Sequence, residues 1–126
     1  MIVIFVALRT EPDSAWTYSN LGLAYLESGN EREAVDALKK AVSIMPDLGT
    51  AQFNLGLAFR RMGMYREAAE AYRDAVRVNP QNAEAHFHLG IMYINLNSED
   101  AAMEEYRILK DLNPALAGHL FNMMKR

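Results

Sequence analysis

Residues 52–59 read QFNLGLAF, and the same frame occurs one period earlier as YSNLGLAY (18–25) and one period later as HFHLGIMY (86–93). The prolines of the chain follow the same 34-residue step: Pro12, Pro46, Pro80 and Pro114. A fixed period in this range is typical of repeat arrays, in which each repeat buries its apolar face against its neighbours. The sequence therefore predicts a repeat architecture for this chain of 126 residues.

Each block contains two helical patterns separated by a turn, because its apolar and small residues recur at i, i+3, i+4 and i+7. In the first block the first helix carries Tyr18, Leu21, Gly22 and Tyr25, and the second carries Ala34, Leu38 and Ala41. Gly29, Gly63 and Asn97 mark the turns, since these residue types tolerate the left-handed conformation at a helix C-terminus. Small residues predict a close approach of the two backbones, and they are Gly22, Gly56, Gly90, Ala34, Ala68 and Ala102.

This pattern resembles the tetratricopeptide repeat family, which has an aromatic-x-x-Leu-Gly-x-x-Tyr motif, then Ala-x-x-x-aromatic, then Pro, on a 34-residue period. The resemblance covers residues 13–114 as three repeats. Departures are Gln52 and His86 at the first aromatic position, Leu38 at the later one, and Leu109 where the other blocks have Ala. The resemblance implies an all-α fold. It would be an α-solenoid of antiparallel helix pairs in a right-handed superhelix, with about seven helices plus a partial N-terminal helix.

The prolines also predict the boundaries of the segments. We expect the tail of a truncated preceding repeat (1–12), three repeats (13–46, 47–80 and 81–114) and an amphipathic C-terminal capping helix (115–126). Residues 1–8 are apolar, but they lack a basic leader and are far shorter than the ~18 residues needed to span a membrane. Because Ala7 lies exactly one period before Ala41, we expect an orphaned helix here and neither a signal peptide nor a membrane anchor.

Composition and charge exclude several classes of function. The formal net charge of −3 comes from 16 acidic and 13 basic residues, which are interspersed and form no basic footprint for nucleic acid or an anionic membrane. The chain has no cysteine, which excludes disulfides, thiolate zinc sites and a cysteine nucleophile. We expect neither nucleic acid nor a membrane as a partner, and a cytoplasmic location is favoured.

The sequence predicts no catalytic, cofactor or metal site. His86 and His88 are two residues apart on a helix and point to different faces, and His119 lies elsewhere, so the three histidines do not form a metal-ligand set. There is no glycine-rich phosphate loop, and no nucleophile stands beside a base at a recognisable spacing. We therefore expect a protein that is not an enzyme.

A second apolar stripe runs along the first helix of each repeat, nearly opposite the packing stripe at about 100° per residue. In the family that the chain resembles, this stripe lines a concave groove. The candidate peptide-binding residues are Asn20, Leu23, Phe53, Asn54, Leu57, Arg60, Arg61, Phe87, His88, Ile91 and Ile94. Two alternatives stay open. Leu23, Leu57 and Ile91 would instead pack between adjacent first helices, and the two arginines would be a solvated helix end.

Asn20 and Asn54 occupy the same repeat position, with His88 as its third member. An amide both donates and accepts hydrogen bonds, and the arrangement resembles the asparagine ladder of O-linked N-acetylglucosamine transferases; a purely structural role is the alternative. The two asparagines also match the carboxylate clamp of chaperone-binding relatives. However, Trp16, Glu84 and His88 occupy the clamp's basic positions. Since a glutamate repels carboxylates, we expect no binding of an acidic chaperone C-terminal tail.

Three hypotheses of function follow. The first is a scaffold that binds a protein or peptide partner in an apolar groove edged by Arg60 and Arg61. The second is a self-associating module, a homo-oligomer in which the apolar residues 1–8 dock onto another copy. The third is the regulatory arm of a larger enzyme, whose catalytic part lies outside these residues.

Overall fold

The computed structural model describes residues 12–126, and all of the regular structure in this range is helical. The helices are α2 (Pro12–Glu27), α3 (Glu31–Ile44), α4 (Gly49–Arg61), α5 (Tyr65–Val78), α6 (Ala83–Asn95), α7 (Glu99–Leu112) and α8 (Pro114–Met124). The prediction of an all-α fold is confirmed. The partial N-terminal helix and the docking of residues 1–8 lie outside the described residues.

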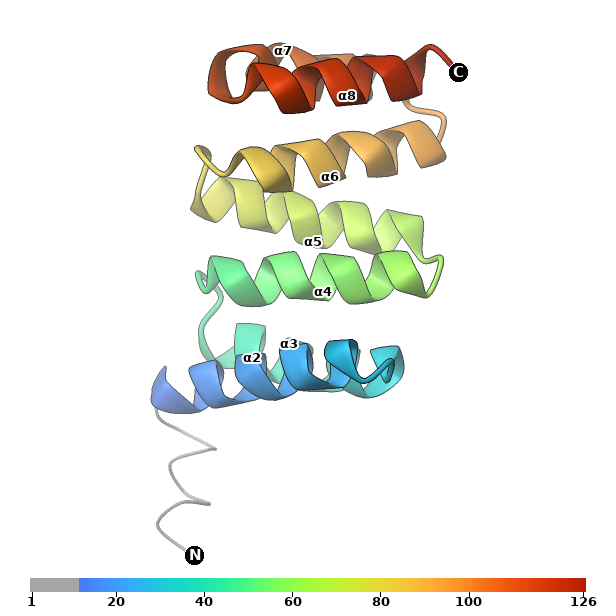
Figure 1. Ribbon diagram of the computed structural model, residues 1–126. Coiled ribbons are helices and arrows are strands. Elements are labelled where there is room, and N and C mark those ends of the chain that lie inside the picture. Colours follow the sequence, from blue (N-terminus) through green and yellow to red (C-terminus); the bar gives the residue numbers. More distant parts are fainter. Residues whose placement is uncertain (1–11) are drawn as a thin grey trace, which may run out of the picture.

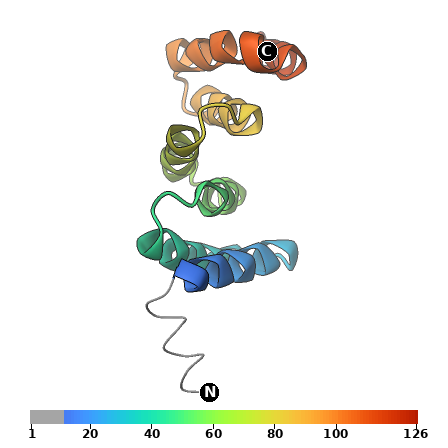
Figure 2. The same cartoon turned by 90° about the vertical axis from the view of Figure 1, so that its left-hand side faces the viewer.

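The helices are stacked in chain order along one axis, from α2 at one end to α8 at the other (Figure 1). Successive helices run in opposite directions and are joined by short loops, and the side view shows them in a zigzag (Figure 2). Each helix therefore packs against its sequence neighbours, as in a solenoid. The predicted α-solenoid of antiparallel helix pairs is confirmed.

The turns inside the helix pairs have the predicted backbone conformation. Gly29, Gly63 and Asn97 have φ values of 82°, 75° and 60°, all in the left-handed region. In the first turn the amide of Asn30 donates to the carbonyl oxygen of Tyr25 at 2.8 Å, and the two other turns repeat this bond at 2.9 and 2.8 Å. These bonds satisfy carbonyl groups that a helix end leaves open, so the same turn chemistry folds each pair.

The first-helix glycines are closely packed, but the atoms that fill the space are side chains of neighbouring helices and not a second backbone, and the partner changes along the stack. A Cβ atom at Gly56 would lie 2.7 Å from the ring of Tyr72 on α5, and one at Gly22 would meet the side chain of Leu38 on α3. At Gly90 the nearest atom is instead Leu120 Cδ2 of α8, at 2.6 Å. The last helix therefore fills, in the third pair, the space that the second helix of the pair fills in the first two.

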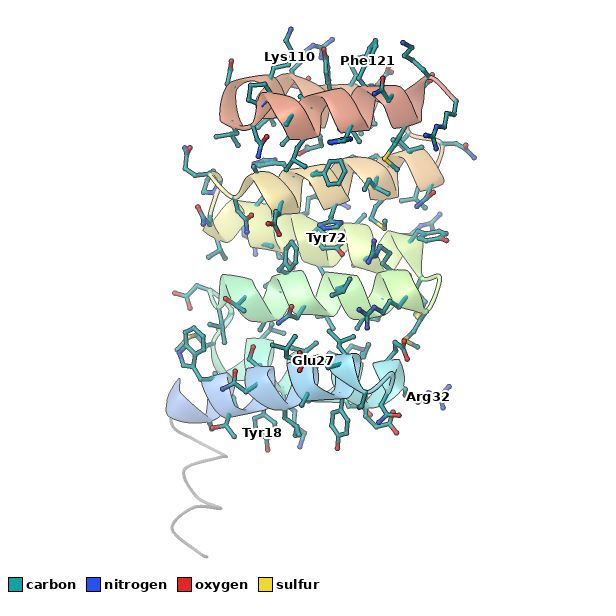
Figure 3. All side chains as sticks on the ribbon, viewed as in Figure 1. Tyr18, Glu27, Arg32, Tyr72, Lys110 and Phe121 are labelled. Atoms are coloured by element: carbon teal, nitrogen blue, oxygen red, sulfur yellow. The ribbon has the colours of Figure 1, made fainter. Side chains whose placement is uncertain are left out.

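The two ends of the described stack differ. Leu55 and Leu89 are 7% and 1% exposed, whereas the equivalent Leu21 is 42% exposed. Figure 3 places Tyr18 at this lower end, on the side away from α4, and Phe121 at the opposite end. At that opposite end α8 buries Ala117 and Leu120 against α6 and α7. The described part of the stack is therefore covered at its α8 end and apolar at its α2 end.

Candidate functional site

The predicted groove residues lie on α2, α4 and α6 and differ in exposure. The exposed ones are Asn20, Leu23 and Arg61; the half-buried ones are Phe53, Leu57, Arg60, Phe87, His88, Ile91 and Ile94; the buried one is Asn54. Leu57 and Ile91 pack against the main core, which favours the packing alternative for these two. Leu23 is 40% exposed, so its side chain remains available to a ligand.

An aromatic cluster forms the centre of this face. Phe53 of α4 meets His88 of α6 edge-on with ring centroids 5.4 Å apart, and Phe87 meets His88 at 5.6 Å. Tyr72 of α5 stacks on His88 at 5.5 Å and meets Phe53 edge-on at the same distance. The structure therefore brings Phe53, Phe87 and His88 together as the sequence suggested. It adds Tyr72, which lies at the middle of the stack (Figure 3).

No feature of the sequence indicates that Tyr72 belongs to this cluster. Its repeat position, shared with Leu38 and Tyr106, belongs to the packing pattern that the sequence predicts for the second helix of each pair. That assignment is correct for the ring, which lies against Gly56. The same fully buried ring also stacks on His88 of α6, and only the three-dimensional arrangement reveals this contact with the aromatic cluster.

Two polar atoms of the cluster have no partner among the described residues, namely the Tyr72 hydroxyl and His88 Nδ1. Burial raises the pKa of Tyr72 to about 12, although the charges of Arg60 and Arg61 act in the opposite direction. Burial also lowers the pKa of His88, and Arg60 adds to this effect while Glu84 opposes it. Both rings are therefore uncharged near neutral pH, and the centre of the face is apolar with two unused hydrogen-bonding atoms.

The two arginines at the end of α4 have different roles. Arg61 Nη1 donates to the carbonyl oxygen of Leu26 at 2.8 Å, which ties α4 to the end of α2. Arg60 is half-buried, and its side chain has no ion pair or hydrogen bond with any residue of the described range. Its charge reaches Tyr72 and His88. Arg60 is therefore the cation that remains available beside the aromatic cluster.

A hollow of about 400 Å³ opens beside the cluster, where the N-terminal ends of α4 and α6 meet the C-terminal end of α5. It is lined by Trp16, Leu48, Gly49, Thr50, Phe53, Ala75, Val78, Asn79, Asn82 and Glu84. Trp16, Thr50 and Glu84 occupy one repeat position in the three successive repeats. Trp16 and Glu84 also stand at positions where a carboxylate clamp has basic residues. The sequence did not indicate that they line one hollow.

The two asparagines of the proposed ladder are not equivalent in the structure. Asn20 is exposed, but Asn54 is only 8% exposed. α2 has no described neighbour on its outer side, whereas α4 lies between α3 and α5. A peptide in the groove would therefore reach the Asn20 amide directly and little of the Asn54 amide.

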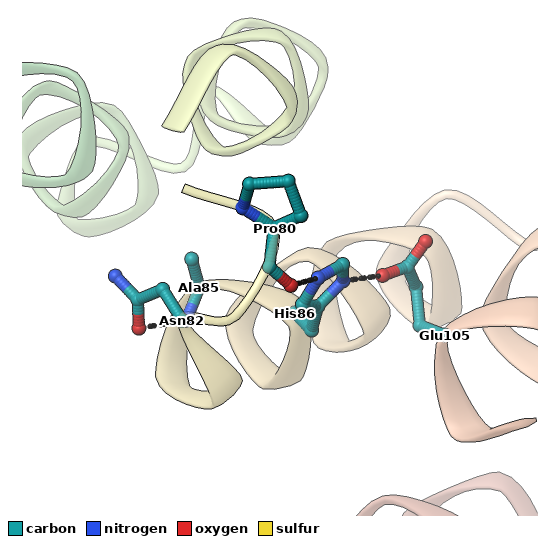
Figure 4. A network of polar contacts seen from close by, with 5 residues as sticks. All are labelled: Pro80, Asn82, Ala85, His86 and Glu105. Atoms are coloured by element: carbon teal, nitrogen blue, oxygen red, sulfur yellow. Dashed lines mark hydrogen bonds and ion pairs between the residues drawn. The ribbon is translucent and has the colours of Figure 1, made fainter. Parts of the chain in front are cut away.

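A separate polar cluster lies away from the aromatic one, at the junction of α6 and α7 (Figure 4). His86 Nδ1 lies 2.7 Å from Glu105 Oε1, and His86 Nε2 donates to the carbonyl oxygen of Pro80 at 2.8 Å. Both side chains are buried. Burial raises the pKa of Glu105, the hydrogen bond and charge of His86 lower it, and Glu104 raises it further. All partners are internal, so this cluster connects helices and faces no groove.

In residues 12–126, no group of three or more His, Cys, Asp or Glu side chains is placed to hold a metal ion. In the same range, no helix combines the length and the apolar character that crossing a bilayer requires.

Comparison with known proteins identifies the repeat and its relatives. Two models described as Tetratricopeptide repeat (TPR) match residues 53–117 and residues 15–48. No curated protein matches the chain. Among solved structures, the first TPR of Spaghetti (RPAP3) bound to the HSP90 peptide SRMEEVD has a TM-score of 0.84 and 20% identity, over 93% of this chain and 94% of that one.

Two further solved structures resemble the chain at similar identity. The crystal structure of MamA has a TM-score of 0.77 and 24% identity, over 91% of this chain and 77% of that one. YrrB, described as a TPR protein with an unusual peptide-binding site, has a TM-score of 0.77 and 23% identity, over 86% of this chain and 57% of that one. These likenesses agree with the solenoid described above.

Proposed function

The chain belongs to the tetratricopeptide repeat family, and from this premise we propose that it is an interaction scaffold that binds a peptide or a segment of a partner protein. The binding site is the groove formed by α2, α4 and α6. The observation that carries the proposal is the aromatic cluster, in which Phe53 and Phe87 remain half-buried on this face. The peptide-bound Spaghetti structures and the peptide-binding site named for YrrB support it.

The physical basis of binding is removal of aromatic surface from water. Completing the burial of a phenylalanine side chain stabilises a complex by up to about 1.5–3 kcal/mol, and two such side chains contact His88 here. Asn20, which is exposed on the same face, offers hydrogen bonds to a peptide backbone, whereas the Tyr72 hydroxyl and His88 Nδ1 are buried. The groove therefore combines apolar affinity with a few polar contacts, as binding sites for peptide segments usually do.

Replacement of the two phenylalanines tests the proposal. Phe53→Asp and Phe87→Asp should each remove capture of the partner from an extract and leave the helical circular dichroism in place. Because both side chains also pack on the core, Phe53→Leu and Phe87→Leu provide milder variants with a weaker loss. Tyr65→Asp is the surface control, since Tyr65 is an aromatic residue at the start of α5 that is more exposed than the two phenylalanines. Capture that survives both aspartate variants in folded protein would refute the groove model.

An acidic chaperone tail is not the ligand that we propose. Spaghetti is seen with the HSP90 peptide SRMEEVD, but here Glu84 and Trp16 stand where the carboxylate clamp has basic residues. Glu84 would repel the carboxylates of such a tail. Trp16 is the only tryptophan of the chain and lines the hollow, so its fluorescence reports directly on binding. A synthetic peptide with this sequence should leave the emission unchanged, and saturable quenching would contradict the proposal.

Self-association is a second candidate function, favoured by one specific observation. Tyr18, Leu21 and Tyr25 form an apolar surface at the outer side of α2, and Leu21 is 42% exposed. We propose that residues 1–8 of another copy cover this surface. Light scattering should then show a mass that increases with concentration for the full chain and not for the Leu21→Lys variant or a chain starting at Asp13. If all three are monomers over a wide concentration range, this idea fails.

A further inference from the structure

We propose that the groove has two charged ends and selects a segment with a basic side chain at one end and an acidic side chain at the other, separated by apolar residues. The basic side chain occupies the hollow beside Trp16 and Glu84, and the acidic one pairs with Arg60. This inference rests on the proposed function, since it names the class of ligand that the same groove accepts.

The Glu84 end of the groove is suited to a cation. Trp16 is 48% exposed, and its ring makes no aromatic or cation contact within the described range. Glu84 is exposed and has no ion pair there. Both line one hollow together with Phe53 and Val78. A lysine or arginine side chain placed in it would have an aromatic face, a carboxylate for its charged group and apolar walls for its methylene stem.

The helix ends around the hollow do not reverse this preference. The C-terminal end of α5 contributes Val78 and Asn79, and the free carbonyl groups of a helix end favour a cation. The N-terminal end of α6 is capped, because the Asn82 side chain accepts from the amide of Ala85 at 3.2 Å. Only the start of α4 favours an anion, since it has no side-chain cap. A helix end corresponds to roughly half a unit charge, which the full charge of Glu84 exceeds.

The other end of the groove is suited to an anion. Arg60 is half-buried, has no anionic partner among residues 14–126, and lies close enough to the cluster to act on His88. The neighbouring Arg61 is already engaged with the carbonyl oxygen of Leu26. A ligand carboxylate at Arg60 would therefore provide an ion pair that the described residues do not supply. Because Arg60 is half-buried, such a pair should stabilise the complex more than a pair on an open surface.

The spacing of the two ends sets the spacing of charges in the ligand. Thr50 is the α4 equivalent of Glu84, and it precedes Arg60 by ten positions on the same helix. Ten positions correspond to about 15 Å along a helix axis. An extended segment covers that length in about four to five residues, at roughly 3.3 Å each. The aromatic cluster lies between the ends, so the intervening ligand residues should be apolar.

Isothermal titration calorimetry with four synthetic peptides and the full chain tests the proposal. All four probes share a central segment of four residues, two of which are phenylalanine. They differ in the two residues that flank this segment. These flanking residues are lysine and glutamate in the mixed probe, and two lysines, two glutamates or two glutamines in the others. The wild type should bind the lysine–glutamate probe most tightly, by about fivefold to tenfold over each like-charged probe at low salt. Equal affinity for the mixed and like-charged probes would overturn the proposal, and so would absence of binding to the mixed probe up to millimolar concentration.

Charge reversal then identifies the two ends. Glu84→Lys should transfer the preference to the two-glutamate probe, and Arg60→Glu should transfer it to the two-lysine probe. The double variant should recover the mixed probe, which binds in the opposite direction. Glu67→Lys, at an exposed position on α5, changes the net charge by the same amount as Glu84→Lys. This control should bind the four probes in the same order of affinity as the wild type. A preference that follows net charge in the control would overturn the assignment.

The glutamine-ended probe separates this inference from the function on which it rests. If it binds as tightly as the mixed probe and the Phe53→Asp variant loses both, the groove binds peptides but does not read charge. If Phe53→Asp leaves all binding unchanged, the groove itself is not the site, and both proposals fail.

Discussion

Gln52 in the second helix pair and His86 in the third occupy the same repeat position, and both donate to the carbonyl oxygen of the preceding proline. The Gln52 contact with Pro46 is long, at 3.4 Å, whereas the His86 contact with Pro80 is 2.8 Å. On the other side, His86 meets Glu105, but the residue equivalent to Glu105 in the second pair is Ala71. One repeat position therefore holds a neutral contact in one pair and a proton-dependent bridge in the next.

The geometry fixes how many protons the bridge holds. A carbonyl oxygen only accepts, so His86 Nε2 must carry a proton. His86 Nδ1 lies 2.7 Å from Glu105 Oε1, and a hydrogen bond between them needs a second proton. That proton is either on Nδ1 of a positively charged imidazolium ring or on Glu105 as a neutral carboxylic acid. Loss of that proton would leave a lone pair of nitrogen facing a buried carboxylate. The stability of the third helix pair therefore depends on a proton between His86 and Glu105, whereas the second helix pair has no such requirement.

The largest expected effect is removal of one partner of the bridge. His86→Leu leaves Glu105 buried without its partner, which should lower the free energy of unfolding by about 3 kcal/mol in urea denaturation. The double variant His86→Gln with Glu105→Ala copies the second pair and should recover most of this loss. Gln52→Leu, which breaks only a long neutral contact, should cost about 1 kcal/mol or less. If His86→Leu and Gln52→Leu lower the free energy of unfolding equally, the bridge to Glu105 adds no stability beyond the neutral contact.

The second prediction concerns the glycines that face different partners. A Cβ at Gly56 meets three ring atoms of the fully buried Tyr72 at 2.7–2.9 Å. A Cβ at Gly90 meets the flexible end of Leu120 on the last helix. We expect Gly56→Ala to cost about 2 kcal/mol and Gly90→Ala less than about 1 kcal/mol, because a methyl terminus moves aside more easily than a packed ring. Thermal and urea unfolding of both variants provide the measurement.

Gly118 is the control for the intrinsic effect of alanine. It lies in α8 with nothing within 4 Å of an added Cβ, so Gly118→Ala should stabilise the protein by up to about 1 kcal/mol through helix propensity alone. If Gly56→Ala also stabilises it, the ring of Tyr72 shifts without cost and the contact is looser than the distances indicate.

The pH dependence of stability provides a third, smaller effect. Burial raises the pKa of Glu105 in the folded protein, so its contribution is fully present below the ordinary pKa of a carboxyl group and is lost as the pH rises through the raised folded value. Urea denaturation as a function of pH should therefore show the wild type losing stability over this interval relative to the double variant with Gln at 86 and Ala at 105. The effect should be smaller than that of His86→Leu, because titration leaves both side chains in place. A pH-independent difference between the two proteins would contradict it.

The period of the sequence was sufficient to predict the helices, the left-handed turns and the face on which Phe53, Phe87 and His88 meet. It could not predict Glu105, because the equivalent residues Ala37 and Ala71 suggest a small packing residue there. The partner of Gly90 was also missed, since Leu120 belongs to α8, which has no counterpart in the earlier repeats. A repeat period predicts that equivalent positions make equivalent contacts. This prediction fails where one repeat has a contact of different chemistry at that position.

The aromatic cluster was predicted to the same degree and for the same reason. Phe53, Phe87 and His88 were placed together because they share the stripe of the first helices, whereas Tyr72 was missed because it reaches the cluster from a second helix. Asn20 and Asn54 share one repeat position but differ in exposure, because only Asn54 has described helices on both sides. The exposure of a residue depends on whether its repeat lies at the end or in the middle of the stack. A repeat pattern in the sequence carries no information on this.

The smallest expected effect compares the tyrosines of the two pairs. Tyr72 is fully buried and its hydroxyl has no described partner, whereas the equivalent Tyr106 is half-buried beside Phe121, with Lys110 over its ring. A buried hydroxyl without a hydrogen bond costs about 1 kcal/mol or more, so Tyr72→Phe should raise the free energy of unfolding by about 1 kcal/mol, and Tyr106→Phe should change it by less than about 0.5 kcal/mol. Calorimetric unfolding of both variants measures the difference. A loss of stability in Tyr72→Phe would mean that the hydroxyl is hydrogen-bonded in solution, and the difference between the two tyrosines would then come from that bond and not from an unsatisfied buried group.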